Sequence, residues 1–260
     1  MKVVEANREI FYSILGAAFK LLQLEPTAVE VGVLKGDNSA KILEMLSPKK
    51  FYLIDQWNVD AFSDYRNNND HRNWVSKTEE YAFYFGGDLT DQTTFDVLYN
   101  NVLERFKDNE NVSIIRESSL PAVNKLKELG VQNINLAYID ASHQFETVLD
   151  DLLAYHSLID RDFGCIQLND CCYSDIGNKQ NLGVLEAAVR FCKMTDFEPI
   201  ALVNRHWTDV LFTPRHSKLN QLIENIFNSS DIPFVEIPNS LFGSLIVKQG
   251  IKRGNISFCS

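Results

Sequence analysis

The chain has 260 residues, 45% of them hydrophobic, and a formal net charge of −10. This length and composition are enough to bury a substantial core within one large globular domain. The acidic balance disfavours extended contacts with nucleic acids or with anionic membrane surfaces, because such interfaces need clustered Lys and Arg side chains. A small molecule is therefore the expected partner.

Cysteine usage and hydropathy bear on the cellular compartment. The five cysteines form no Cys-x-x-Cys pair, so we expect reduced thiols in a cytoplasmic protein. The adjacent Cys171 and Cys172 are expected to pack rather than to bind an ion. No segment approaches about 20 uninterrupted apolar residues, and charges interrupt the apolar N-terminal stretch, so neither a membrane span nor a secretory signal is predicted.

Helix and strand signals alternate along the chain. An amphipathic helix is predicted at 7–24, ending before Pro26. Strands are then predicted at 27–31, 51–54, 112–115, 135–139 and 165–168, with helices near 38–46, 97–107, 120–129, 145–159 and 181–194. Apolar runs at 198–203 and 209–213 predict a hairpin. The stretch from about 217 onward predicts a short helix and two short strands.

This alternation predicts a Rossmann-like, mostly parallel, doubly wound α/β sheet of about seven strands, with an antiparallel C-terminal hairpin and helices on both faces. We expect one domain over 1–260, with an N-terminal helix within 1–25 and a C-terminal extension at 215–260. The segment 58–87, rich in Asn, Asp and aromatic residues, interrupts the alternation. It is either a substrate-facing lid or a surface insertion, and with the N-terminal helix it offers a surface for a homo-oligomer.

The first strand after the N-terminal helix runs into a turn with two glycines, VEVGVLKGDNSAKIL at 29–43. Gly32 and Gly36 allow a tight turn, and the free amides at the helix start favour a negatively charged group. Glu30 would repel a pyrophosphate and attract an ammonium group, which indicates a zwitterionic ligand whose carboxylate Ser39 is placed to meet. The alternative is that Glu30 only finishes an edge strand before an ordinary turn.

An acid also follows the next strand. Asp55 lies about 20 residues beyond the glycine turn, where nucleotide-binding α/β proteins place an acid on ribose hydroxyls. Gln56 and Trp57 beside it are suited to frame an adenine by hydrogen bonding and stacking. The alternative role for Asp55 is to cap the loop between a strand and a helix.

The order Glu30-x-Gly32-x-x-x-Gly36, then Asp55, then Asp140 after the fourth strand resembles the class I methyltransferases that use S-adenosylmethionine. With YIDASHQFETVLDDL at 138–152, the chain is most similar to bacterial O-methyltransferases of the macrocin and aminocoumarin type, which act on sugars and related natural products. The resemblance implies a cofactor site that includes Asp140, adenine-side contacts at Ser118 and Ser119, and a small-molecule acceptor. A helix cap, with Pro121 in the first turn, explains Ser118 and Ser119 equally well.

A metal site is also expected. Asp140, Asn169 and Asp170 carry hard oxygen donors at the ends of adjacent strands, which suits Mg²⁺, and by resemblance the matching positions of metal-dependent relatives bind that ion. Such an ion lowers the pKa of an acceptor hydroxyl and holds it in line with the methyl group. Ser142 replaces a second acid of the relatives, so His143 is the candidate general base. Alternatively, His143 contacts the cofactor or caps the next helix.

Two other functions are compatible with these residues. A dinucleotide-dependent oxidoreductase would use the same kind of sheet, but Glu30 and the lack of a third glycine argue against it. A non-catalytic or metal-independent member of the methyltransferase fold is the other alternative, because Asn169 stands where the natural-product enzymes carry Asp. His206 and Trp207, in the hairpin turn, are either substrate contacts or an exposed pair.

Overall fold

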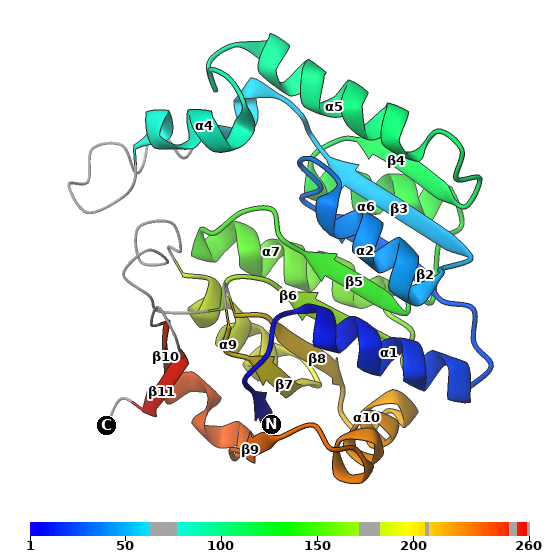
Figure 1. Ribbon diagram of the computed structural model, residues 1–260, viewed down its shortest axis with the longest axis vertical. Coiled ribbons are helices and arrows are strands. Elements are labelled where there is room, and N and C mark those ends of the chain that lie inside the picture. Colours follow the sequence, from blue (N-terminus) through cyan, green and yellow to red (C-terminus); the bar gives the residue numbers. More distant parts are fainter. Residues whose placement is uncertain (63–76, 172–182, 206–207, 250–253, 259–260) are drawn as a thin grey trace.

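The computed structural model describes residues 1–62, 77–171, 183–205, 208–249 and 254–258. The strands are β1 (Lys2–Val4), β2 (Thr27–Val31), β3 (Lys50–Asp55), β4 (Val112–Arg116), β5 (Leu136–Ile139), β6 (Cys165–Leu168), β7 (Phe197–Val203), β8 (Val210–Pro214), β9 (Phe234–Glu236), β10 (Leu245–Gln249) and β11 (Gly254–Phe258). The helices are α1 (Glu9–Leu21), α2 (Asp37–Leu46), α4 (Ala82–Phe85), α5 (Gln92–Phe106), α6 (Ser119–Glu128), α7 (Phe145–Tyr155), α9 (Val184–Met194) and α10 (Lys218–Ser229). Figure 1 shows their arrangement.

One nine-stranded sheet, in the order β4-β3-β2-β5-β6-β8-β7-β1-β9, forms the centre of the fold. The strands from β4 to β6 run parallel, and β8 is antiparallel to both of its neighbours. This confirms the predicted fold class, including the antiparallel hairpin of β7 and β8. The sheet has more than seven strands because β1 and β9 extend its edge beyond β7. The last two strands, β10 and β11, pair in a separate small sheet.

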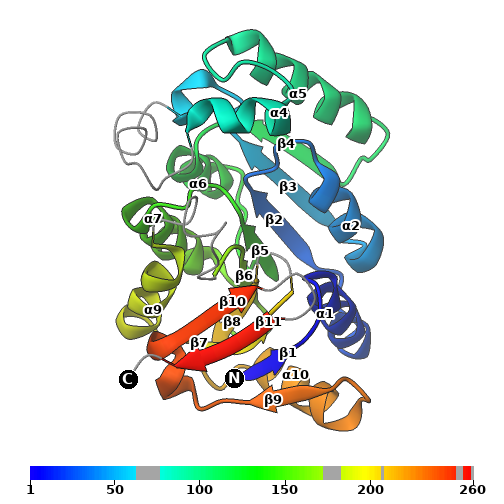
Figure 2. The ribbon, with the colours of Figure 1, turned by 60° about the vertical axis from the view of Figure 1, so that its left-hand side comes forward.

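Helices cover both faces of the sheet (Figure 2). One core packs α6, α7 and α9 against the sheet, and the other packs α1, α2, α5 and α10 against the opposite face. Alternate strand residues point to opposite faces. In β5, Leu136 and Tyr138 therefore belong to one core, and Ala137 and Ile139 to the other. The near-continuous apolar runs read from the sequence are what such a doubly covered sheet requires.

Several elements differ from the sequence-based expectation, and two of them do so for identifiable local reasons. The helix expected near 97–107 begins earlier, at Gln92, because the Asp91 side chain caps it by accepting from the backbone N–H of Thr93 at 2.9 Å. Strand β1 was not predicted, since three residues are too few to show a period. Its pairing with β7 anchors the segment that leads into α1.

The strand order places a topological switch point beside β2. The chain proceeds outward from β2 to β3 and β4, then returns to add β5 on the other side of β2. The loops after β2 and β5 therefore leave the sheet in different directions and open a crevice at its carboxyl edge. Ligands bind in such crevices in open α/β sheets, so this edge positions the site.

The described part of the 58–87 segment contains the 3₁₀ turns Val59–Phe62 and Thr78–Tyr81 and the short helix α4. Residues 63–76 lie outside the described ranges. In the part of the chain that is described, no helix is both long and apolar enough to cross a membrane.

Candidate functional site

A cleft of about 1280 Å³ opens at the carboxyl edge of the sheet. Loops after β2, β3, β4, β5 and β6 line it, together with the start of α1 and Tyr84 of α4. The residues singled out from the sequence that line this cleft are Glu30, Gly32, Asp55, Gln56, Trp57, Ser119, Asp140, His143, Asn169 and Asp170. Gly36 and Ser39 are not among its lining residues.

The two glycines of the turn after β2 have different roles. Gly32 has a φ of 90°, and a Cβ placed on it would lie 2.0 Å from the carbonyl oxygen of Asp140. The loops after β2 and β5 can pass this closely at the switch point only because residue 32 has no side chain. Gly36 has a φ of 74°, and its Cβ would lie 2.8 Å from the Phe106 ring of α5. It therefore serves helix packing and the start of α2, away from the cleft.

Glu30 is held by the first turn of α2. Its side chain is only 1% exposed, accepts a hydrogen bond from Asn38 Nδ2 at 3.0 Å, and accepts another from the hydroxyl of Ser39. Burial raises the pKa of Glu30 to about 7, against the effect of these two hydrogen bonds. The Ser39 side chain is completely buried, so its hydroxyl supports Glu30 rather than pointing to where a ligand carboxylate was expected.

Asp55 ties the glycine turn to the end of β3. One carboxylate oxygen accepts from the backbone N–H of Leu34 and the other from that of Trp57, each at 2.9 Å. Burial raises the pKa of Asp55, and the backbone N–H groups oppose that rise. The backbone N–H groups of Val33 and Gln56 also contribute, so both the loop after β2 and the loop after β3 converge on this carboxylate.

Trp57 was expected to frame an adenine, but its side chain is 1% exposed. Its indole Nε1 donates to the carbonyl oxygen of Leu34 at 2.9 Å, and its ring lies 5.1 Å from that of Tyr99. The Trp57 side chain therefore stabilises the glycine turn through this hydrogen bond. Gln56 is partly exposed and lines the cleft.

An acidic group lies where the loops after β5 and β6 meet. Donor atoms of Asp140, His143 and Asp170 all lie within 4.8 Å of one another. Nε2 of His143 is 2.8 Å from Asp170 Oδ2 and 3.8 Å from Asp140 Oδ1. Burial alone would lower the pKa of His143, but the hydrogen bond and charge of Asp170 and the charge of Asp140 raise it. Burial and the charge of Asp170 raise the pKa of Asp140.

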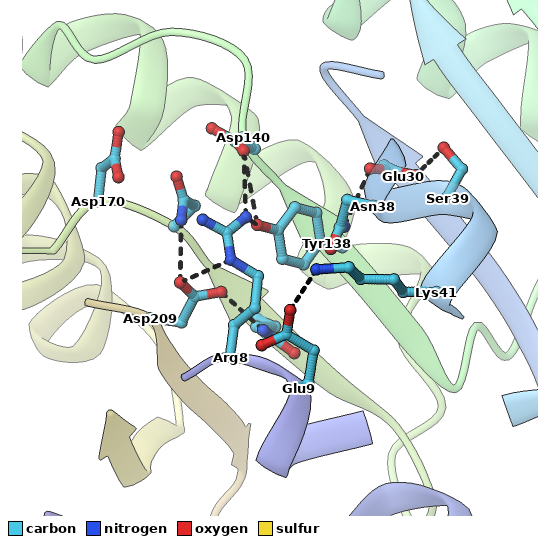
Figure 3. A network of polar contacts seen from close by, with 12 residues as sticks. Arg8, Glu9, Glu30, Asn38, Ser39, Lys41, Tyr138, Asp140, Asp170 and Asp209 are labelled. Atoms are coloured by element: carbon cyan, nitrogen blue, oxygen red, sulfur yellow. Dashed lines mark hydrogen bonds and ion pairs between the residues drawn. The ribbon is translucent and has the colours of Figure 1, made fainter. Parts of the chain in front are cut away.

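Arg8 and Asp209 complete this network, and sequence reasoning missed both (Figure 3). The Arg8 guanidinium lies 3.6 Å from Asp140 Oδ2 and 3.6 Å from Asp209 Oδ1, and it donates to the hydroxyl of Tyr138. Buried Asp209 also accepts from Gln167 at 2.7 Å and from Asn169 at 2.9 Å. The one available signal was an acid at the start of a buried apolar strand, since such a carboxylate needs partners.

Asn169 was predicted as a metal ligand, and the structure shows that half of its side-chain amide already has another partner. Its amide nitrogen is committed to Asp209, so its carbonyl oxygen is the atom left for a ligand. The donor atoms found together are those of two carboxylates and one imidazole. Such a mixed set fits a divalent ion, and imidazole shifts the preference from Mg²⁺ toward ions such as Mn²⁺ that accept both donor types.

His206, Trp207 and Cys172 lie outside the described residues. Cys171 is buried, as expected for a packing role.

Comparison with known proteins gives distant likenesses. No family model matches the sequence, and no curated protein matches it. Among solved structures, an O-methyltransferase from Bacillus cereus in complex with SAH is 12% identical, with 80% of this chain and 81% of that one covered and a TM-score of 0.48. The O-methyltransferase TomG from Streptomyces achromogenes, involved in tomaymycin synthesis and in complex with SAM, is 10% identical, with 81% and 82% covered and a TM-score of 0.48.

A third similar structure is fibrillarin from Aeropyrum pernix with natively bound S-adenosyl-L-methionine. It is 12% identical, with 78% of this chain and 76% of that one covered and a TM-score of 0.47. Likenesses at this level carry no argument about the activity of this chain, which therefore has to be argued from its own residues.

Proposed function

We propose that the protein is an S-adenosylmethionine-dependent methyltransferase that methylates a hydroxyl of a small molecule, such as a sugar or a secondary metabolite, with the help of a divalent ion. The main support for this proposal is the geometry of the topological switch point beside β2. There, Gly32 passes against the backbone of Asp140, and Glu30, Asp55 and Asp140 belong to three adjacent parallel strands and their ends. The cleft thus offers acids along its length at the place where open α/β sheets bind ligands.

The charge pattern suits a cationic cofactor. A sulfonium and an ammonium group are both attracted by carboxylates, whereas a pyrophosphate at the glycine turn would meet Glu30. In this proposal Glu30 attracts the amino-acid end of the cofactor, Gly32 gives it room, and Asp55, which lines the cleft, accepts from the ribose hydroxyls.

At the reacting end, the methyl group passes from sulfur to the acceptor oxygen, and the hydroxyl proton must be removed. Asp170 holds the Nε2 side of His143, which leaves Nδ1 as the nitrogen that takes this proton. Asp140 and Asp170 would hold the ion, with the carbonyl oxygen of Asn169 as a further donor, and His143 beside them would act as the base rather than as a ligand. A bound divalent ion would supply charge that favours the ionised acceptor oxygen.

The acceptor side of the cleft is where the 58–87 segment contributes, and we propose that this segment acts as a lid. Tyr84 lines the cleft, and Lys35 of the glycine turn donates to the carbonyl oxygen of Tyr84 while its ammonium lies 5.1 Å from the ring centre. These contacts connect α4 directly to the turn that would hold the cofactor.

Binding of S-adenosylhomocysteine tests the cofactor assignment. We expect the wild type to bind it in a calorimetric titration and to show no binding of NADH. Asp55→Asn removes the charge that accepts from ribose and should weaken binding by about tenfold or more. Asp108→Asn, on an exposed residue away from the cleft, is the matched control. A wild type that binds NADH instead, or an Asp55→Asn variant that binds as tightly as the control, would contradict the assignment.

Manganese binding tests the metal assignment separately. Electron paramagnetic resonance of added Mn²⁺ should report one bound ion in the wild type, and competition with Mg²⁺ gives the relative affinity. Asp170→Asn removes one anionic donor of the group and should weaken Mn²⁺ binding by at least about tenfold. Asp231→Asn, at an exposed site, should change nothing. Equal Mn²⁺ binding by the wild type and Asp170→Asn would remove the ion from the proposal and leave the cofactor assignment in place.

A further inference from the structure

One wall of the cleft is formed by the first turn of α6 and one face of α7. Ser119 and Leu120 line it from α6, and Gln144, Thr147 and Asp151 line it from α7 and its N-cap. The last three residues are spaced by three and four positions, so they share one helical face that turns toward α6.

Residues of α7 hold the hydroxyl and the carbonyl oxygen of Ser119. Its hydroxyl donates to Asp151 Oδ1, and its carbonyl oxygen accepts from the Tyr155 hydroxyl at 3.0 Å. Asp151 and Tyr155 are four residues apart on α7 and both are buried. The first residue of α6 is therefore clamped in one orientation before any ligand arrives.

Asp151, one of the two α7 residues that hold Ser119, has an unusual environment for a carboxyl group. The side chain of Asp151 is 1% exposed, and its Oδ2 finds no hydrogen-bond partner within the described ranges. Burying an unpaired carboxyl oxygen is unfavourable by comparison with an apolar residue or a fully paired one. A residue needed only to fill space between two helices would not be an acid, so the direction of the Ser119 hydroxyl is the property that Asp151 controls.

That direction fixes what the wall offers to a ligand. A serine hydroxyl has one hydrogen to donate and two lone pairs. With the hydrogen committed to Asp151, the Ser119 hydroxyl presents only an acceptor. The backbone N–H groups of Ser119 and Leu120 have no carbonyl partner inside the helix and can act as donors, whereas Pro121 has no N–H and Ala122 donates to the carbonyl oxygen of Ser118. The wall therefore offers an acceptor next to donors.

We propose that Asp151 is a positioning residue that sets ligand specificity through Ser119, so that this wall accepts a heteroaromatic base with an exocyclic amino group beside a ring nitrogen and rejects the corresponding oxo base. An amino group donates and its neighbouring ring nitrogen accepts, whereas an oxo group accepts and the neighbouring ring N–H donates. The inference rests on the proposed function, because it assigns the adenine end of the cofactor to this wall.

The protonation state of Asp151 provides an independent readout. Burial raises the pKa of Asp151 to about 7, against the hydrogen bond from Ser119, and the charge of Asp150 adds to the rise. Tyr155 also faces it from α7. Above this pKa the carboxylate can only accept, so the Ser119 hydroxyl must donate to it. Below the pKa the carboxyl can donate instead and release the hydroxyl hydrogen toward the ligand, so discrimination should be stronger at pH 8.5 than at pH 6.

The test compares S-adenosylhomocysteine with its 6-oxo counterpart, S-inosylhomocysteine, by calorimetric titration of the full chain. At pH 8.5 the wild type should favour the amino ligand by about tenfold or more, because the oxo ligand leaves buried acceptors facing each other. Asp151→Asn can donate to Ser119 and should lower this ratio by about tenfold. Ser119→Ala, which removes the acceptor without touching Asp151, should lower it as well. Asp150→Asn makes the same charge change on the exposed side of α7 and should keep the wild-type ratio.

The outcomes separate this inference from the proposed function. If the wild type binds the amino ligand but its preference is the same in Asp151→Asn and Ser119→Ala, the specificity role of Asp151 is wrong and the cofactor assignment stands. A preference that does not change between pH 6 and pH 8.5 also overturns the role. If the wild type binds neither ligand, both the inference and the proposed function fall. Thermal unfolding of each variant establishes that it is folded. If Asp151→Asn does not fold, Ser119→Ala still tests the inference, because it removes the acceptor and leaves Asp151 in place.

Discussion

Glu30→Gln is expected to stabilise the ligand-free protein at pH 8 and to weaken its binding of S-adenosylhomocysteine. The pKa of Glu30 rises from 4.5 to about 7 on folding. As the pH rises from about 4.5 to about 7, the unfolded chain loses this proton while the folded chain retains it, so the free energy of unfolding falls through that window. Above pH 7 the loss is complete and amounts to about 3 kcal/mol at 1.36 kcal/mol per pKa unit. Glutamine does not ionise, so the Glu30→Gln variant does not lose this stability as the pH rises.

The binding effect has the opposite sign. A ligand ammonium near Glu30 favours the carboxylate, and glutamine cannot supply that charge, so we expect about tenfold weaker binding. Chemical denaturation at pH 5 and pH 8, with calorimetry at pH 8, measures both effects. Glu44→Gln, on the exposed side of α2, is the matched control. A Glu30→Gln variant that gains no stability between pH 5 and pH 8 relative to wild type, or that binds the ligand unchanged, would count against this account of Glu30.

Asp209→Ala should lower the free energy of unfolding by about 3–5 kcal/mol, the usual loss when one partner of a buried ionic network is removed. Asp209 accepts from Gln167 and Asn169 and faces the Arg8 guanidinium. The alanine variant leaves both amide groups without this acceptor and removes one of the two carboxylates that face Arg8. The midpoint and slope of a urea titration, measured by fluorescence and by circular dichroism, give the change.

Two further variants define the cause of this loss. Asp231→Ala, at an exposed acid, should change the stability by no more than about 0.5 kcal/mol. Arg8→Met combined with Asp209→Ala should recover part of the loss, because it also removes the guanidinium that has lost one of its two carboxylate partners. If Asp209→Ala were no more destabilising than the control, the network in Figure 3 would not be what fixes α1 at the edge of the cleft.

The sheet and the main acids of the cleft could be predicted from sequence because they depend on local patterns. Apolar runs such as those of β2 and β6 end at turn residues, and parallel strands end at one edge of a sheet. Asp55 at the end of β3, Asp140 after β5 and Asp170 after β6 were therefore expected at the same edge of the sheet. The role of Gly32 could also be predicted from the sequence, because a glycine directly after a buried strand indicates a tight or crowded turn.

The partners of those acids could not be predicted, because they depend on side-chain directions and on segments distant in sequence. Ser39 lies in the first turn of α2, and only the docking of that turn against β2 shows that its hydroxyl reaches Glu30. Arg8 reaches Asp140 because β1 pairs with β7 and brings α1 to the cleft, and β1 is too short to be recognised by periodicity. The sequence also could not show that the Asn169 amide nitrogen donates to Asp209, 40 residues later, which leaves the carbonyl oxygen of Asn169 for a ligand.

A crystal structure of the protein grown with S-adenosylhomocysteine would show directly whether and where the cofactor binds. We expect the ligand to lie in the cleft with its amino-acid end near Glu30 and Gly32, its ribose hydroxyls within hydrogen-bonding distance of Asp55, and its adenine between α6 and α7 beside Ser119. A ligand bound outside this cleft, or bound within it with the adenine at the Glu30 end, would contradict this expectation.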